Sequence, residues 1–321
     1  MKNKVAFIVP YFGTLPNYFY LWLNSASWNT DFDFMIFTDN IINIEPMRNI
    51  KVINTSFSNF KDRIQALFDF KISLSRPYKL CDYKPVYGAA FEKELQGYDF
   101  WGHCDVDLIF GDLKKYITDE VLDKNDRIYN LGHCTLYRNC ETMNNLYRIC
   151  HDYDDCFSYK YAYTTDFSTS YDEIGTKYGY GLSTICERIK IKNYISLDFA
   201  DIDPERFNFE LVYTEGEKAD YFAYEAGKIV GVTEGSEKEY AYVHLQKRIM
   251  SVDVKDNNKF YISPIWFRST IETVRDDLTS KRQRKQFEKA VILRKIKSKE
   301  NKLKSNAVRH YLNRVRRKIN I

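Results

Sequence analysis

The 321-residue sequence lacks any run of about 18 uncharged apolar residues, so we expect no membrane-spanning helix. The N-terminal apolar stretch is too short for a signal peptide, and no small-residue cleavage site follows it. We interpret residues 5–10 as the first strand of the fold. With 44% hydrophobic and 29% charged residues, the composition is that of a soluble globular chain, which we expect in the cytoplasm.

Paired cysteine spacings are also missing. The seven cysteines include no Cys-x-x-Cys, and their odd, scattered set favours reduced thiols over a disulfide framework or a zinc site. Three catalytic motifs are absent as well: Gly-x-x-x-x-Gly-Lys-Ser/Thr, His-Glu-x-x-His and Gly-x-Ser-x-Gly. The glycines within residues 178–183 form no dinucleotide fingerprint, because no strand precedes them in a βαβ unit.

Acidic residues become scarce only near the C-terminus. Residues 268–321 hold 18 Lys and Arg against 5 Asp and Glu, a net charge of +13, whereas the whole chain carries +4. We therefore expect an acidic domain over 1–267 and a basic amphipathic α-helical segment over 268–321. Apolar residues recur in that segment at helical offsets, at Val308, Tyr311, Leu312, Val315 and Ile319.

Three roles stay open for the basic segment. It can bind an anionic membrane surface, dock on the acidic domain, or bind a polyanion such as nucleic acid. We favour the membrane surface and expect no nucleic-acid partner.

Strands and helices alternate along the first part of the chain. A helix is predicted over 15–27 after the first strand, and further strands over 33–38 and 50–53. This order begins a βαβ unit and predicts an α/β fold, with a mixed, mostly parallel sheet flanked by helices. Further helices are predicted over 58–73, 84–95, 141–152 and 182–190, and further strands over 99–104, 128–131, 134–137, 221–225, 228–232 and 240–245.

Two carboxylates stand one residue apart at the end of an aromatic, apolar run. Asp105 and Asp107 follow the predicted strand 99–104, and the apolar residues 108–110 come directly after them. Ionised carboxylates beside buried apolar segments need a charge partner. A divalent cation shared with a diphosphate would be one. The alternative is a solvated strand end, and the strands on both sides favour the metal.

Five segments, in order between about residues 4 and 250, carry a resemblance to a known family. They are Val9-Pro10-Tyr11-Phe12-Gly13, Phe37-Thr38-Asp39, Lys79-Leu80-Cys81-Asp82-Tyr83-Lys84-Pro85, Tyr98-Asp99-Phe100-Trp101-Gly102-His103-Cys104-Asp105-Val106-Asp107 and Tyr242-Val243-His244-Leu245-Gln246-Lys247-Arg248. With them the chain resembles bacterial capsular and exopolysaccharide-biosynthesis glycosyltransferases (DUF6625-like). The resemblance implies a GT-A like, Rossmann-like fold with an Asp-x-Asp motif.

The resemblance also implies a metal site for Mn²⁺ or Mg²⁺. Asp107 would ligate the ion, Asp105 would ligate it or hydrogen-bond the ribose, and His244 would complete the shell. The ion would act as a Lewis acid toward the departing diphosphate. A structural histidine on an alternating strand is the alternative for His244.

Further residues are implied at the nucleotide-sugar. The base and ribose would lie against Pro10, Tyr11, Phe12, Gly13 and Asp39. The diphosphate or donor sugar would be oriented by Lys79, Asp82, Lys84, Lys247 and Arg248. The alternative for Asp39 is an Asx turn with Asn40. The alternative for the Lys79–Lys84 motif is that its charged residues are plain surface charge.

A catalytic base is needed if the reaction inverts the anomeric centre, because one carboxylate must deprotonate the acceptor hydroxyl. Asp172 and Glu173 are the candidates, since they lie in a loop shortly before the glycine-rich turn. Asp166 is held in reserve, and His133 is placed on the acceptor side. An acidic surface loop is the alternative.

The predicted function is thus a metal-dependent, inverting hexosyltransferase. It would move a sugar from a nucleotide-sugar, such as UDP-galactose in pyranose or furanose form, to a lipid-linked or growing surface polysaccharide. We expect it at the inner face of the cell membrane. Two other functions stay open: a non-catalytic protein that binds an anionic membrane or polyanion through its tail, and a nucleotidyltransferase on a related fold.

Overall fold

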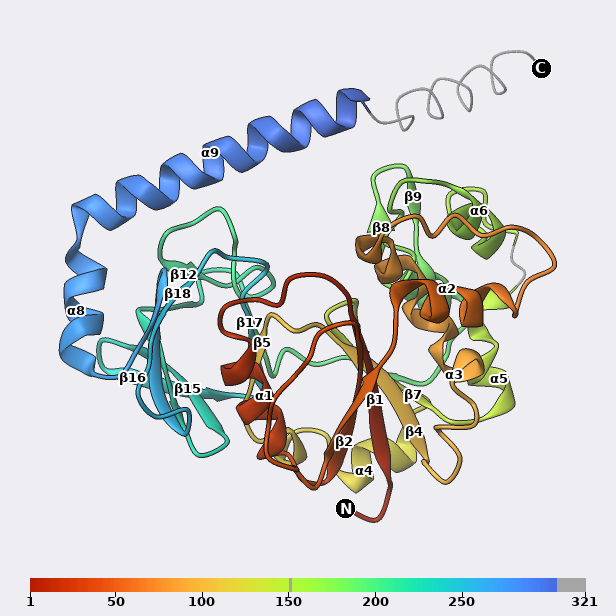
Figure 1. The fold of residues 1–321 in the computed structure, drawn as a ribbon, viewed down its shortest axis with the longest axis horizontal. Coiled ribbons are helices and arrows are strands. Elements are labelled where there is room, and N and C mark those ends of the chain that lie inside the picture. The colour runs from red at the N-terminus through yellow and green to blue at the C-terminus, as the bar shows by residue number, and fades with distance from the viewer. Residues whose placement is uncertain (150–151, 305–321) are drawn as a thin grey trace.

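The computed structural model describes residues 1–149 and 152–304. At its centre lies a seven-stranded sheet of order β10-β6-β7-β4-β1-β2-β3 (Figure 1). Its strands are β1 (Val5–Tyr11), β2 (Phe32–Thr38), β3 (Ile50–Asn54), β4 (Phe100–Cys104), β6 (Arg127–Leu131), β7 (Cys134–Arg138) and β10 (Asn193–Tyr194).

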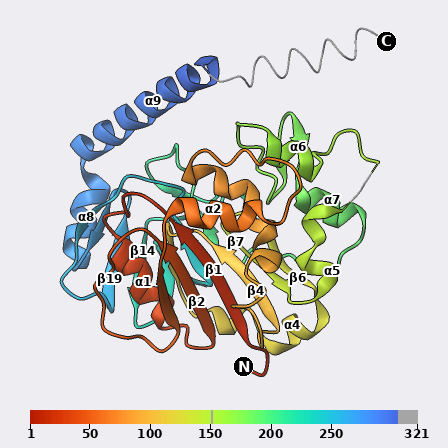
Figure 2. The same ribbon diagram turned by 45° about the vertical axis from the view of Figure 1, so that its right-hand side comes forward.

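Parallel pairing dominates this sheet. β1 is parallel to β2 and β4, β2 to β3, and β10 to β6, whereas β7 is antiparallel to both of its neighbours. Figure 2 shows β2, β1 and β4 side by side. The carboxyl ends of β1, β2 and β4 therefore meet at one edge, where α/β sheets commonly bind ligands.

Both faces of the sheet are buried. Val5, Phe7 and Val9 of β1 enter one core, and Ala6 and Ile8 enter the other, because strand side chains alternate between faces. α1 (Phe19–Ser27) packs in the first core, whereas α2 (Phe57–Gln65), α3 (Tyr87–Ala90) and α7 (Leu182–Arg188) pack in the second. The predicted α/β fold, with a mostly parallel sheet flanked by helices, is confirmed.

A small three-stranded sheet of order β11-β17-β5 adjoins the large one. It consists of β5 (Leu108–Phe110), β11 (Ala200–Asp201) and β17 (Tyr242–His244). Ile109 and Val243 of this sheet share a third core with Phe222 and Phe260 of a six-stranded sheet of order β16-β15-β14-β19-β20-β18. The six strands are β14 (Tyr221–Glu225), β15 (Lys228–Thr233), β16 (Ser236–Tyr240), β18 (Ser251–Asp253), β19 (Lys259–Ser263) and β20 (Trp266–Arg268).

All three helices predicted before residue 100 differ from the structure. α1 begins at Phe19 instead of residue 15, because the chain turns at Pro16, whose carbonyl accepts from Phe19 N. The second half of the helix predicted over 58–73 is wrong, since α2 ends at Gln65 and the Gln65 side chain bonds the loop at Phe70 and Ile72. The helix predicted over 84–95 is also wrong as drawn. A 3₁₀ helix, η1 (Pro77–Val86), precedes the short α3, as a proline inside the segment requires.

The remaining short elements connect these layers. The residues predicted as one helix over 141–152 form α5 (Glu141–Asn144) and the 3₁₀ turn η3 (Leu146–Arg148). The others are η2 (Leu113–Lys115), α4 (Asp119–Lys124), α6 (Tyr159–Thr164), β8 (Gly175–Thr176), β9 (Gly179–Tyr180), β12 (Phe209–Glu210) and β13 (Lys218–Ala219).

Two helices follow the six-stranded sheet. α8 (Ile271–Thr279) packs beside β19 and β20, and α9 (Lys281–Lys304) projects away from the sheets in both views (Figures 1 and 2). Within the described ranges no helix is both long and apolar enough to cross a membrane. The apolar stripe predicted from Val308 to Ile319 lies outside the described residues, and the domain division at residue 268 stays a prediction.

Candidate functional site

The Asp105–Asp107 segment joins two sheets. β4 of the large sheet ends at Cys104, and β5 of the small sheet begins at Leu108. β5 runs antiparallel to β17, with Leu108 opposite His244. A segment more than 130 residues further along the chain is thereby placed directly beside Asp107.

Asp107, His244 and Asp201 form a line of side chains. His244 Nδ1 lies 2.7 Å from Asp201 Oδ1, and His244 Nε2 lies 3.6 Å from Asp107 Oδ1. Gln246 Nε2 also donates to Asp201 Oδ1, at 2.8 Å. A histidine bonded at one ring nitrogen to a carboxylate presents the other nitrogen in a fixed direction, which is the usual support of a metal-ligating histidine.

The charges of this line depend on one another. Burial lowers the pKa of His244, but Asp107 and Asp201 outweigh it and raise that pKa to about 10. Burial likewise opposes ionisation of Asp107, but His244 and Lys247 hold its pKa well below the usual range. Asp107 is therefore ionised across the physiological range. His244 is protonated in the same state, so ligation of an ion by its ring nitrogen would release that proton.

A strained turn completes the surroundings of Asp107. Gln246 and Lys247 both have positive φ, 48° and 58°, which side-chain-bearing residues rarely adopt. In this conformation Lys247 N donates to Asp107 Oδ2 at 2.8 Å. Lys247 Nζ reaches Tyr78, lying 4.3 Å from its ring centroid and 3.3 Å from its hydroxyl.

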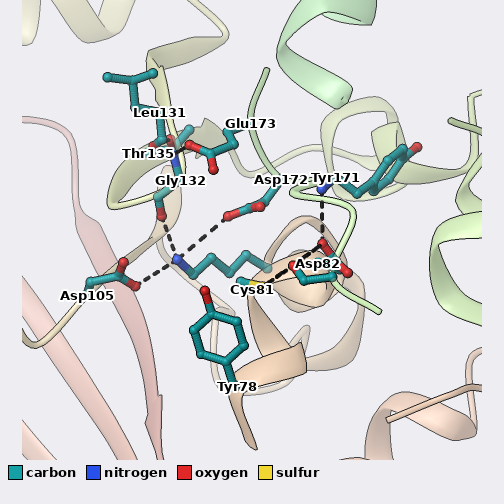
Figure 3. A network of polar contacts seen from close by, with 12 residues as sticks. Tyr78, Cys81, Asp82, Asp105, Leu131, Gly132, Thr135, Tyr171, Asp172 and Glu173 are labelled. Carbon is teal, nitrogen blue, oxygen red and sulfur yellow. Dashed lines mark hydrogen bonds and ion pairs between the residues drawn. The ribbon is translucent and has the colours of Figure 1, made fainter. Parts of the chain in front are cut away.

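Lys84 links the Asp-x-Asp segment to the loop after residue 165. Figure 3 shows its three partners, Asp105, Gly132 and Asp172, facing one another. Its buried Nζ lies 2.7 Å from Asp105 Oδ1, 2.6 Å from Gly132 O and 3.6 Å from Asp172 Oδ2. Burial would lower the pKa of Lys84, yet Asp105 and then Asp172 raise it well above its ordinary value. Lys84 is therefore a fixed cation behind Asp105.

Asp172 and Glu173 lie on the far side of this lysine. Burial raises the pKa of Asp172 well above its ordinary value, even though Lys84 opposes the rise. Asp105 is the closer partner of Lys84, and Asp172 Oδ1 has no hydrogen-bond partner within the described residues. Glu173 is partly exposed and accepts from Gly132 N at 3.3 Å.

Lys79 and Asp82 pair with each other beneath the site. Asp82 also accepts from the backbone N–H groups of Thr169 and Tyr171, and Lys79 donates to the carbonyls of Ala162 and Phe167. Both side chains are almost fully buried. Their contacts order residues 162–171, so the structure places them under the loop that carries Asp172 and away from the cavity wall. The reserve candidate Asp166 lies on that loop and accepts a hydrogen bond from Ser73 Oγ.

A cavity of about 630 Å³ opens in front of Asp105 and Asp107. Its walls come from the end of β1, from η1 and from the turn after β17. The lining residues include Pro10, Tyr11, Phe12, Tyr18, Tyr78, Cys81, Lys84, Asp105, Asp107 and Lys247. A volume of this size suits a small-molecule ligand.

Asp39 and Gly13 lie beside this cavity without lining it. Asp39 Oδ1 accepts from Gly13 N at 3.1 Å and from Asn40 Nδ2 at 3.1 Å, which joins the ends of β1 and β2. Phe12 packs against Phe57 and Phe60 in the core. The exposed Asp39 carboxylate and the Tyr11 ring are thus held at the same sheet edge.

Arg248 follows Lys247 directly and is one of the residues that line the cavity, but its guanidinium bonds the protein backbone. Its guanidinium donates to backbone carbonyls of residues 203–207 and of Pro264, and it is almost fully buried. The structure does not bring this guanidinium to the predicted phosphate-binding groups.

The donor set fits a divalent cation. Asp105, Asp107 and His244 each offer a ligand atom within 4.8 Å of the others. Two carboxylates with one imidazole suit Mn²⁺ or Mg²⁺ better than a thiolate-seeking ion. His133, Asp201 and His244 form a second such group, in which the ring of His133 lies 4.4 Å from that of His244.

Sequence reasoning missed Tyr78 and Asp201. Tyr78 is one residue before the recognised Lys79–Lys84 motif, so its aromatic ring beside two lysines was the available signal. Asp201 lies in a two-residue strand with no pattern of its own, and only its parallel pairing with His244 reveals it.

Comparisons with known proteins give one family and a larger set of similar solved structures. Residues 7–270 match the family of unknown function DUF6625, and no curated protein matches. The crystal structure of the galactosyltransferase LgtC with donor and acceptor sugar analogues is similar at a TM-score of 0.32 and 12% identity, covering 61% of this chain and 75% of that one. An active-site mutant of LgtC gives 0.37 and 11%, covering 76% and 88%. Since the family match spans most of the sequence, the chain belongs to DUF6625.

Proposed function

We propose that this protein is a metal-dependent glycosyltransferase of the GT-A type. It would transfer a hexose from a nucleoside diphosphate donor, a UDP-sugar such as UDP-galactose, to a sugar acceptor. The observation that carries the proposal is the Asp201–His244–Asp107 line, which ends at a cavity large enough for a nucleotide-sugar.

Each part of the cavity wall has a task in this reaction. Asp105, Asp107 and His244 would hold Mn²⁺ or Mg²⁺. When bound, the ion would stabilise the negative charge that develops on the leaving diphosphate. Lys247 adds a fixed positive charge beside Asp107, and Tyr78 restricts its ammonium group to the cavity. Tyr11 would contact the base, and Asp39, beside the cavity, would bond the ribose.

The acceptor side would lie near Gly132, His133 and Glu173. Glu173 is partly exposed whereas Asp172 is buried, so Glu173 is the better base if the anomeric centre is inverted. The anomeric proton signal of the product in NMR tests the stereochemistry directly. A product with the same anomeric configuration as the donor would exclude inversion.

The acceptor is proposed to be lipid-linked or a growing surface polysaccharide. This rests on the basic residues of α9 and of the sequence after it, which would attract the anionic inner face of the cell membrane. The enzyme would then be a cytoplasmic, peripheral membrane protein.

The deciding experiment measures thermal stability with Mn²⁺ and UDP, GDP, CMP or no nucleotide. A ligand at about 100 times its dissociation constant adds about 2.7 kcal/mol of stability. We expect a Mn²⁺-dependent shift with UDP, and loss of both this shift and sugar transfer, by about 100-fold or more, in Asp107→Asn. Asp112→Asn is the matched control, because this exposed acid lies five residues further along the same segment.

The outcomes separate the alternatives. A shift with GDP or CMP would keep the transferase and change its donor. Pyrophosphate release from a nucleoside triphosphate would favour a nucleotidyltransferase. Normal transfer by Asp107→Asn would refute the metal site, and the absence of any nucleotide shift would favour a non-catalytic protein that binds through its tail.

A further inference from the structure

Arg248 is a buried cation that bonds no carboxylate of the described residues. Its Nη1 donates to Phe207 O and Pro264 O, both at 2.8 Å, and its Nη2 donates to Asp203 O at 3.0 Å and to Arg206 O. Burial lowers its pKa to about 9, which still leaves the side chain charged at neutral pH. Five fixed donors in a plane allow a guanidinium to hold several carbonyls at once, which an ammonium group cannot do.

Aromatic rings complete the surroundings of this guanidinium. It lies 5.0 Å from the ring centroid of Phe209 and 4.7 Å from that of Phe287. Phe287 belongs to α9 and is 8% exposed, and its ring lies 5.7 Å from that of Phe207. Arg284, one turn earlier in α9, stacks on Phe207 at 4.7 Å and bonds Asn208. The first turns of α9 are therefore one wall of the Arg248 site.

The backbone connects Arg248 directly to the candidate metal ligands. Arg248 N donates to Leu245 O at 2.9 Å, which closes the turn containing the strained Gln246 and Lys247. Within that turn Lys247 N holds Asp107 Oδ2, and the Gln246 side chain holds Asp201. Two consecutive residues with positive φ are strained and persist only where their surroundings fix them.

We propose that Arg248 is a positioning residue for the metal site, and that α9 acts on this site through Phe287. Arg248 anchors the end of the turn, the turn fixes Asp107 and Asp201, and Asp201 fixes His244. The inference rests on the proposed metal site and adds a determinant of its affinity that contacts neither ion nor substrate.

The test compares Mn²⁺ affinity with fold stability in the full-length protein. Free Mn²⁺ is followed by electron paramagnetic resonance during titration, and unfolding is followed by circular dichroism. We expect Arg248→Lys to weaken Mn²⁺ binding about tenfold or more, and Phe287→Ala to weaken it by a smaller factor while keeping the fold. The effect should be absent in Arg268→Lys. Arg268 is the matched control, because it is a partly buried arginine beside an aromatic ring, Trp266, but bonds Asp253 and Asp277 and not the turn.

Three results distinguish a failure of the proposed function from a failure of the positioning role. If wild-type protein does not bind Mn²⁺, the proposed function fails. If wild-type binds Mn²⁺ and Phe287→Ala and Arg248→Lys bind it equally well, only the positioning role fails, even when their melting temperatures fall. Should Arg248→Lys not fold, Phe287→Ala decides alone, and an unchanged Mn²⁺ midpoint in that variant overturns the inference.

Discussion

At the residue scale, the candidate site depends on side chains that orient other side chains. Asp201 is the best example, because it lies 2.7 Å from His244 Nδ1 and is itself bonded by Gln246. It contributes no cavity wall, yet it decides which ring nitrogen of His244 faces Asp107.

Replacing Asp201 should therefore act on metal affinity first. We expect Asp201→Asn to weaken Mn²⁺ binding about 10- to 100-fold, measured by the Mn²⁺ concentration that gives half-maximal thermal stabilisation. Asp220→Asn should leave this concentration unchanged, since that exposed acid directly precedes β14 and is not among the residues that line the cavity. Equal midpoints for wild-type and Asp201→Asn would show that Asp201 does not orient a metal ligand.

Asp172 predicts a pH dependence of stability. Burial raises its pKa above the unfolded value near 3.8, so folding favours the protonated form. Its stabilising contribution is complete below that unfolded value and is lost as pH rises toward the raised value. We expect the melting temperature of Asp172→Asn, relative to wild-type, to increase between pH 4 and pH 7. A difference that stays constant over this range, in parallel melts at several pH values, would contradict the assignment.

The sequence allowed some of these residues to be predicted and not others. Asp105 and Asp107 are adjacent in the chain and interrupt an apolar run, so their unusual environment is visible without a structure. The partnership of Lys79 with Asp82 was read as possible ligand binding, because sequence does not tell whether a charged pair faces solvent, a ligand or a buried loop. The strain at Gln246 and Lys247 leaves no sequence signal, since neither is glycine.

At the element scale, the motif that ends α7 contains a lysine in the left-handed conformation. Lys190, exposed and with φ 60°, occupies the left-handed position after the helix, where glycine is favoured. Lys190 N bonds Glu187 O and Ile191 N bonds Cys186 O, as in a Schellman motif.

Lys190→Gly should consequently stabilise the protein. Removing the left-handed strain gains about 1–2 kcal/mol, and the extra entropy glycine loses on folding offsets about half of this. We expect a net gain of about 0.5–1 kcal/mol, or a rise of about 1–2 °C in melting temperature by calorimetry. Lys192→Gly, two residues later and outside the motif, should give no rise. A lower melting temperature for Lys190→Gly would mean that the lysine side chain contributes to packing.

The strand predictions were correct where a whole apolar run belongs to one sheet. The apolar runs of β1, β2 and β4 are buried on both faces, and their strands were predicted to within one or two residues. The run predicted as one strand over 240–245 is two, since β16 belongs to the six-stranded sheet and β17 to the small one, with Ala241 between them. Hydrophobic periodicity indicates which residues are buried, but it does not show that the chain passes from one sheet to another.

At the scale of the whole molecule, α9 exposes a mixed face. Ile292, Leu293 and Ile296 are 58%, 56% and 48% exposed, and Lys285 and Lys289 lie within the same arc of the helix. Phe287 and Arg294 contact the body of the protein from the other side. The exposed arc combines apolar and basic groups, as helices at membrane interfaces do.

Vesicle sedimentation tests the proposed membrane surface. The full chain should sediment with vesicles containing anionic lipid and stay in solution with zwitterionic ones, and salt should release it by screening. Leu293→Glu should weaken the binding severalfold, whereas Ile195→Glu, equally exposed on the body of the protein, should not. Equal binding to both lipids would refute an electrostatic attachment.

The pairing of β5 with β17 also determines when, during synthesis, Asp107 and His244 can come together. Asp107 leaves the ribosome more than 130 residues ahead of His244, its neighbour in the small sheet. At about 5–20 residues per second, that interval is on the order of ten seconds. During it the parallel strands β1 to β4 are complete, but His244 is not yet present as a ligand. A nascent chain halted before residue 242 would thus carry the predicted Asp-x-Asp motif without the histidine that is paired beside it in the folded protein.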